Sequence, residues 1–166
     1  MKFQELKKEM PKIFEKVKKD VRRVLGRHRA GLSLGLIELG ITSDGLIGGM
    51  HFHPGTDIVM NKTPLEIILK SQPYEIVWAY IYHILLHEYI HSLGIIDEQK
   101  CRAITLKISE DIFKEADHPA IILAKRGIGA YIPNLTILYK RPEQRPDGIS
   151  IEYVQDFDIE SQSYFS

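Results

Sequence analysis

Apolar residues near the N-terminus recur every three or four positions, as they would on one side of a helix. Between residues 2 and 26 they are Leu6, Met10, Ile13, Phe14, Val17, Val21, Val24 and Leu25. Lys and Arg occupy the other side, so the pattern predicts an amphipathic helix. Pro11 interrupts it. The proline predicts either a short helix that ends at Met10, followed by a second one that starts at Pro11, or one kinked helix.

The pattern changes to alternation between residues 31 and 41, where Leu32, Leu34 and Leu36 occupy every second position. Such alternation predicts a strand, and Gly35 inside it indicates a bulge or a close approach of a neighbouring segment. Turn-forming pairs and a β-rich stretch follow as far as residue 62, so we expect further strands there.

Two helices that begin near prolines come next. Thr63 and Pro64 predict the start of a short helix, with Thr63 as the N-cap and Pro64 at the first helical position. Pro73 opens the next helix, whose residues 74–86 are mostly apolar or aromatic and include neither Pro nor Gly. A run of this kind is typical of a buried helix.

The remaining part of the chain contains two more predicted helices. The first covers residues 97–116, and the second begins at Pro119 and ends at Gly127. Beyond Gly129 several prolines predict irregular structure. Residues 149–166 comprise an alternating segment that predicts a strand, residues 149–154, and a polar tail. The order of these elements indicates an α+β fold.

Length and composition are those of one soluble domain spanning residues 1–166. No stretch approaches 18 apolar residues, and the N-terminus lacks the apolar segment of a signal peptide, so we expect no membrane span. Cys101 is the single cysteine, which excludes a disulfide within the chain and fits a cytoplasmic location.

The formal net charge is zero, but residues 1–30 hold eleven Lys and Arg against four Asp and Glu. A basic segment of this kind can bind nucleic acid or a membrane surface. We favour a solvated helix face that pairs with the more acidic remainder, and nucleic acid stays open as a partner.

The stretch from His87 to Asp97 has the spacing H-E-x-x-H-x-x-G-x-x-D. On a helix, His87 and His91 lie one turn apart, about 6 Å along the axis. Two imidazoles in this arrangement can bind one ion at about 2.0–2.1 Å from each nitrogen, which suits Zn²⁺. Glu88 lies beside that face, where it can act on a water as a general base without binding the metal.

The third metal ligand is expected from the segment after the helix. Gly94 permits a left-handed backbone that ends the helix and turns the chain back. The turn allows Asp97 to bind the ion, with the fourth position open for water as in catalytic zinc sites. Glu98 competes for this role, and we favour Asp97 because of its +6 offset from His91. Asp97 is also the natural N-cap of the next helix.

This stretch resembles the zincin metallopeptidases, and within them the metzincin-type motif that continues from the second histidine through a glycine to a third ligand. Most metzincins have His at that third place, and the snapalysin group has Asp, as here. The resemblance covers residues 74–98 and implies zinc, a mixed twisted sheet in front of the helix, and hydrolysis of peptide bonds. A metzincin also has a Met-turn downstream, whereas all four Met residues here lie upstream. The chain is therefore similar to a minimal or divergent zincin.

In zincins an edge strand above the cleft binds the substrate backbone as an added strand. Residues 50–53 and residues 57–61 are the two candidates that this resemblance suggests.

Five further residues could carry chemistry. His83, one turn before the motif, is a possible substrate contact or transition-state donor, although we expect it to bond to backbone or water. His51 and His53 could line the cleft or bind a second metal, but surface histidines are the simpler interpretation. Tyr131 is a candidate to stabilise an oxyanion, by resemblance to zincins that use a downstream tyrosine. Cys101 is either a core residue or a ligand that keeps the enzyme latent.

These observations predict a zinc-dependent peptidase that acts on a peptide or protein substrate, with Zn²⁺ bound by His87, His91 and Asp97 and with Glu88 as general base. Two alternatives stay open. One is a zinc endoribonuclease, from a family that uses H-x-x-x-H-x-x-G-x-x-H without the Glu and for which the basic N-terminal helix would bind RNA. The other is a non-catalytic zincin whose metal supports a binding fold. Glu88 favours the peptidase, because a base is what the ribonuclease pattern lacks.

Overall fold

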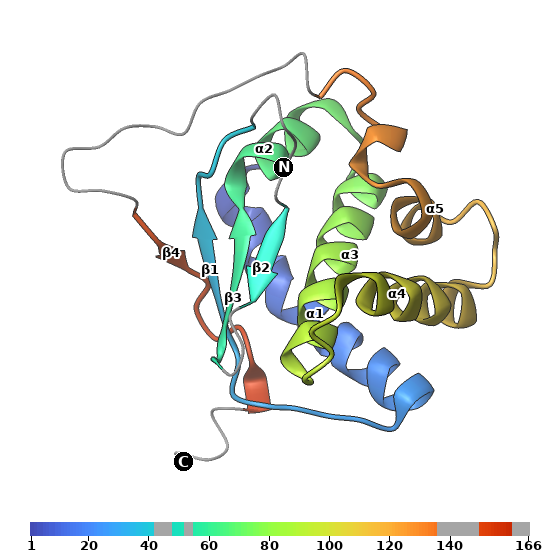
Figure 1. Ribbon diagram of the computed structural model, residues 1–166. Helices are drawn as coiled ribbons and strands as arrows, with labels where there is room; N and C mark the ends of the chain where they lie inside the picture. The colour runs from blue at the N-terminus through green and yellow to red at the C-terminus, as the bar shows by residue number, and fades with distance from the viewer. Residues whose placement is uncertain (42–47, 52–54, 136–149, 161–166) are drawn as a thin grey trace.

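The computed structural model describes residues 1–41, 48–51, 55–135 and 150–160. In these ranges the protein combines helices with a small mixed sheet, so the α+β class is confirmed. The helices are α1 (Phe3–Leu25), α2 (Lys62–Ser71), α3 (Tyr74–Ser92), α4 (Glu98–Phe113), α5 (Pro119–Arg126) and the short 3₁₀ helix η1 (Ile128–Ala130). The strands are β1 (Ser33–Ile37), β2 (Gly49–His51), β3 (Asp57–Asn61) and β4 (Glu152–Tyr153). Figure 1 shows the sheet on one side of α3, with α4 and α5 on the other.

The sheet has the strand order β2-β3-β1-β4. The central pair, β1 and β3, is parallel, and each outer strand is antiparallel to its neighbour. Of the two candidate edge strands, residues 50 and 51 belong to β2, which packs on α3 and is the outermost strand of the sheet in the described residues, while residues 52 and 53 lie outside them. The alternative, residues 57–61, is wrong, because β3 pairs on both sides and its residues 58–61 are buried.

The N-terminal segment forms one helix, α1, which continues through Pro11. Its apolar residues, among them Leu6, Phe14 and Val17, are buried against the rest of the protein, mainly α3. A proline inside a helix removes one backbone hydrogen bond. Burial of the apolar face offsets that loss, since each large side chain contributes about 1.5–3 kcal/mol.

The start of α2 differs from the prediction. The helix begins at Lys62, one residue before Thr63, and the side chain of Asn61 accepts a hydrogen bond from the Thr63 N–H at 3.1 Å. Asn61 ends β3 and caps α2 at once, while the Thr63 hydroxyl accepts a hydrogen bond from the Gly40 N–H at 3.0 Å. Thr63 is therefore not the N-cap, because the preceding strand delivers an asparagine to that position.

The helix α3 lies at the centre of the molecule, as its apolar sequence predicted. It contacts α1, α2, α4, α5 and the strands β2 and β3. Between residues 76 and 93 the side chains that keep partial exposure are Trp78, His83, Ile84, His87 and His91. Three of these five are histidines spaced one turn apart, so the accessible stripe of α3 is largely a histidine stripe.

The two helices after α3 lie where the sequence placed them. Asp97 is the N-cap of α4, and Gly127 ends α5. The helix α4 ends at Phe113, three residues before the predicted boundary, because Lys114 adopts a positive φ of 65°. Over the described ranges, no helix has the length and apolar character that crossing a bilayer requires.

The C-terminal segment is more deeply packed than a polar tail. Phe157 and Asp158 are buried, and the buried ammonium of Lys18 lies 2.7 Å from the Asp158 carboxylate. Upstream, β4 pairs with β1, and a Cβ added to Gly35 would lie 2.8 Å from the Ile151 side chain. The glycine in β1 therefore marks a close approach, one of its two predicted meanings. Residues 136–149, part of the segment for which irregular structure is predicted, lie outside the described residues.

Candidate metal centre

His87 and His91 project from the accessible stripe of α3 into one space. Their ring centroids lie 4.8 Å apart, and each side chain is 14% exposed. After Gly94, which has a φ of 97°, the chain turns back, and the Ile95 carbonyl oxygen comes to 2.7 Å from His91 Nδ1. A ring nitrogen held by a backbone carbonyl fixes the tautomer and leaves Nε2 free to bind a metal.

The carboxylate of Glu98 lies against both histidines. Its Oε1 is 2.8 Å from His87 Nε2, and its Oε2 is 3.0 Å from His91 Nε2. Burial alone would raise the pKa of Glu98, but the two neighbouring imidazoles lower it below the ordinary value. Burial lowers the pKa of His87, which favours the neutral imidazole that a metal needs.

Asp97, the ligand expected from the sequence, lies elsewhere. Its Oδ1 accepts a hydrogen bond from the Lys100 N–H at 2.8 Å, as the N-cap of α4. Asp97 as the third ligand stays a prediction, but it is the Glu98 carboxylate that lies against both histidines. The reason is the helix start: the N-cap side chain turns back onto its own helix, whereas the first helical residue is free to reach the histidines.

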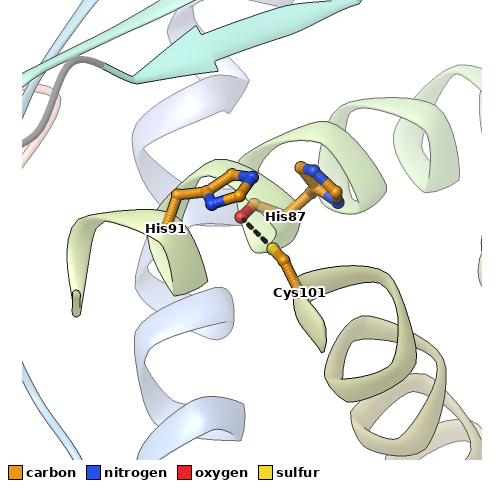
Figure 2. Close-up of side chains that lie close together, drawn as sticks. All are labelled: His87, His91 and Cys101. Atoms are coloured by element: carbon orange, nitrogen blue, oxygen red, sulfur yellow. Dashed lines mark hydrogen bonds between the residues drawn. The ribbon is translucent and has the colours of Figure 1, made fainter. Parts of the chain in front are cut away.

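Cys101, one turn further along α4, approaches the same pair (Figure 2). Its thiol donates a hydrogen bond to the His87 carbonyl oxygen at 3.2 Å. The ligand atoms of His87, His91 and Cys101 all lie within 4.8 Å of one another. Burial raises the pKa of the thiol to about 12, so without a cation it stays protonated. Cys101 is buried in the core, and its sulfur lies close enough to the two histidines to serve as a further metal ligand.

The residues present fit a metal ion. Each contact between Glu98 and a histidine needs a proton, and a single divalent cation could replace both protons. Two ligand atoms bound to a tetrahedral ion at 2.0–2.1 Å would lie about 3.3 Å apart. The distances of 2.8 and 3.0 Å between the Glu98 oxygens and the histidine Nε2 atoms therefore need to lengthen by only a few tenths of an ångström. Two imidazoles with a carboxylate or a thiol suit zinc and several other first-row metals.

Glu88 lies next to the two histidines, but its carboxylate is not among the candidate metal ligands. The residue is only 5% exposed, and its Oε2 has no hydrogen-bond partner among the described residues. Burial raises the pKa of Glu88 to about 7. A Cβ added to Gly49 in β2 would lie 3.2 Å from Glu88 Cγ, so the edge strand passes directly over this side chain.

A cavity of about 600 Å³ adjoins the site. Along α3 it is lined by Tyr80, His83, His87 and Glu88, and residues of α4, α5 and η1 form the opposite wall. His83 therefore faces the cavity, with a buried Nδ1 that has no partner in the described ranges. Burial lowers the pKa of His83 to about 4, which keeps the ring neutral.

The other candidates from the sequence do not belong to the site as described. His51 lies in β2 and its Nε2 is 2.8 Å from the Gly55 carbonyl oxygen. Tyr131 follows η1, and its own carbonyl oxygen accepts a hydrogen bond from the Gln72 side chain at 3.3 Å. Neither residue lines the cavity. His53 lies outside the described residues.

The +6 offset favoured Asp97 over Glu98, and nothing in the pattern pointed to Tyr80 as a cavity residue. A signal for Glu98 was available: Asp is a strong N-cap residue, and a residue used as a cap is less free to bind a metal. Tyr80 had no such signal, because a tyrosine in an apolar helix is equally compatible with the core. Comparisons with models of protein families, with curated proteins and with solved structures found no match.

Proposed function

We propose that the protein is a zinc-dependent peptidase with a zincin-like active site, built from His87, His91 and Glu98. The observation that carries this proposal is the contact of one carboxylate with both histidine Nε2 atoms, beside the buried and unpartnered carboxyl oxygen of Glu88. A zinc ion bound there would supply Lewis-acid chemistry at a substrate carbonyl and a water.

Glu88 has the properties of a general base in this reaction. A carboxylate with a pKa near neutrality accepts a proton from water and can return it to the leaving amine. Its burial keeps bulk water from competing for the proton, and its place beside the histidines leaves the carboxylate out of the donor set. Acid–base assistance of this kind is typically worth about 10²–10⁴-fold in rate.

The edge strand β2 supports a peptide as the substrate. It is the last strand of the sheet in the described part of the chain, it packs on α3, and Gly48 and Gly49 line the cavity beside Glu88. An extended peptide can add to such an edge by backbone hydrogen bonds. That arrangement would hold a scissile bond above the histidine pair.

The experiment that tests the proposal is a cleavage assay on a generic peptide library, with the zinc content measured on the same samples. Glu88→Gln keeps the size of the side chain but cannot accept a proton. The variant should keep its zinc and its melting temperature and lose at least about a hundredfold in cleavage rate.

His87→Ala is the companion variant, because it should lose both zinc and activity. Equal cleavage by wild type and Glu88→Gln at equal zinc content would reject the mechanism. A zinc-loaded wild type that cleaves no peptide would favour the non-catalytic or the ribonuclease alternative.

A further inference from the structure

The cavity beside the histidine pair extends well beyond the atoms that the proposed reaction uses. From His87 it runs back along α3 through His83 to the buried Tyr80, and residues of α4 and α5 line its other side. A volume of about 600 Å³ is in the range of sites that bind small ligands or substrate side chains.

The floor of this cavity presents polar atoms without partners. The Tyr80 hydroxyl and His83 Nδ1 are buried, and neither has a hydrogen-bond partner in the described part of the chain. Tyr80 itself is only 2% exposed. Buried polar atoms are nearly always paired, by protein, water or ligand. The floor therefore favours an occupant that carries hydrogen-bonding groups.

The rim of the cavity is basic. Arg102 on α4 and Lys125 and Arg126 at the end of α5 all line it. Arg102 lies 3.4 Å from Glu98, and Lys125 lies 3.9 Å from Glu110. These pairs are solvent-exposed and therefore weak. Within the described ranges no acidic group pairs with Arg126.

The acidic side chains that line the cavity already have roles in the proposed function. Glu88 and Glu98 are the acidic residues among those that line the cavity in the described ranges, and the proposed function uses both. Leu123, Ala124 and Ile128 supply an apolar section of the wall. A polar floor, a basic rim and an apolar wall together match a group with a carbon stem and a negatively charged end.

We propose that this cavity is a substrate subsite for a carboxylate, with Arg126, Lys125 and Arg102 as the specificity-determining residues and Tyr80 as a hydrogen-bond donor on the floor. The inference rests on the proposed peptidase function and names its substrate class: peptides with an Asp or Glu side chain, or with a free C-terminus, at the position that enters the cavity. A carboxylate of a peptide is favoured over a phosphate of RNA, because the adjoining edge strand suits a peptide backbone.

The test measures binding rather than cleavage, so it does not depend on turnover. Short peptides are titrated into the zinc-loaded Glu88→Gln protein. In one arm each position in turn carries Glu or Gln, and in the other the C-terminus is free or amidated. We expect carboxylate-bearing peptides at one position to bind about tenfold more tightly than their neutral counterparts, the effect of one charge-assisted contact.

Substitutions in the rim and the floor should remove this selectivity. With Arg126→Gln, the ratio of affinities for charged and neutral peptides should fall towards one. Tyr80→Phe, which deletes only a hydroxyl, should weaken the favoured peptides severalfold. Lys107→Gln on the exposed surface of α4 is the matched control and should leave the ratio unchanged. Melting temperatures of all variants report on folding.

Three outcomes would overturn the inference: equal affinity for charged and neutral peptides, selectivity that survives both Arg126→Gln and Tyr80→Phe, or tighter binding of a short single-stranded RNA than of any peptide. The first two would leave cleavage by the wild type intact, so they reject the subsite without rejecting the peptidase. Selective binding with no cleavage by the wild type would reject the peptidase and keep the carboxylate site.

Discussion

Asp97 and Glu98 are sequence neighbours with the same charge, but their side chains have different surroundings. Asp97 bonds to the backbone of its own helix, whereas the Glu98 carboxylate lies between the Nε2 atoms of His87 and His91. The offset of six residues from the second histidine favoured Asp97 in the sequence. Helix capping opposes it, because the Asp97 carboxylate already accepts the N-cap bond, which is worth about 1 kcal/mol.

Metal content should therefore respond to substitution of Glu98 and not of Asp97. Glu98→Gln removes the charge that the two imidazoles face, and we expect zinc affinity to fall by at least about a hundredfold, since loss of outer-shell partners alone costs 10–100-fold. Asp97→Asn is a matched control, because asparagine caps a helix as well as aspartate does. Competition with a chromophoric chelator measures both affinities. A larger loss for Asp97→Asn would return the third position to Asp97.

At the scale of elements, the site depends on how closely β2 packs on α3. A Cβ added to Gly49 would lie 2.8 Å from Ile84 Cγ2, 3.1 Å from the Val59 carbonyl oxygen and 3.2 Å from Glu88 Cγ. The first distance is shorter than a Cβ tolerates, and the second is tight and involves a backbone oxygen, which yields less readily than a side chain. Glycine at position 49 thus sets the distance between the edge strand and the base.

Gly49→Ala should lower the free energy of unfolding by about 1–3 kcal/mol, the usual cost of overpacking. It should also reduce cleavage, because the strand is pushed away from Glu88. Urea denaturation and the peptide assay measure the two effects. Gly129→Ala is the matched control, since an added Cβ there meets no atom within 4 Å.

Removal of the obstructing methyl group provides a further check. In the double variant Gly49→Ala/Ile84→Ala the loss of stability should be smaller than the sum of the two single losses, because the Ile84 side chain no longer opposes the new Cβ. Strict additivity would mean that the close packing of Gly49 against Ile84 is not what makes glycine necessary.

Periodicity in the sequence predicted the helices well, because each has an apolar face or an apolar run whose burial requires the helix. It predicted α3 as a buried helix for the same reason, whereas the end of α3 near Gly94 was predicted from the left-handed backbone that glycine permits. It could not predict that residues 157 and 158 are buried, since the partner of Asp158 is Lys18, far away in the chain. Contacts between distant segments, such as this pair or the cavity between α3 and α5, leave no local pattern.

At the scale of the whole molecule, the basic N-terminal segment is engaged with the protein itself. Lys7 and Lys18 pair with Glu152 and Asp158 of the C-terminal segment, and Arg27 donates a hydrogen bond to the Leu93 carbonyl oxygen. Arg29 donates to the Ser92 carbonyl oxygen at 2.6 Å. The two arginines place positive charge at the C-terminal end of α3, where the helix dipole is negative.

Arg29→Met should therefore affect stability and not RNA binding. It removes a charged donor from the end of the helix that carries the histidines, and we expect a loss of about 1–3 kcal/mol in the free energy of unfolding. Arg23→Met, at an exposed position of α1, is the control with the same loss of charge and should cost less than about 0.5 kcal/mol. Urea denaturation measures stability, and fluorescence anisotropy with a short RNA at several salt concentrations measures binding.

If the basic segment bound RNA instead, both substitutions would weaken RNA binding. That binding would fall steeply with salt, because each phosphate contact releases counterions. Arg29→Met would then leave the stability close to that of the wild type. That result would favour the ribonuclease over the peptidase. If only Arg29→Met loses stability, and neither the wild type nor the variants bind RNA, the role of the basic charge is to hold the histidine helix in place.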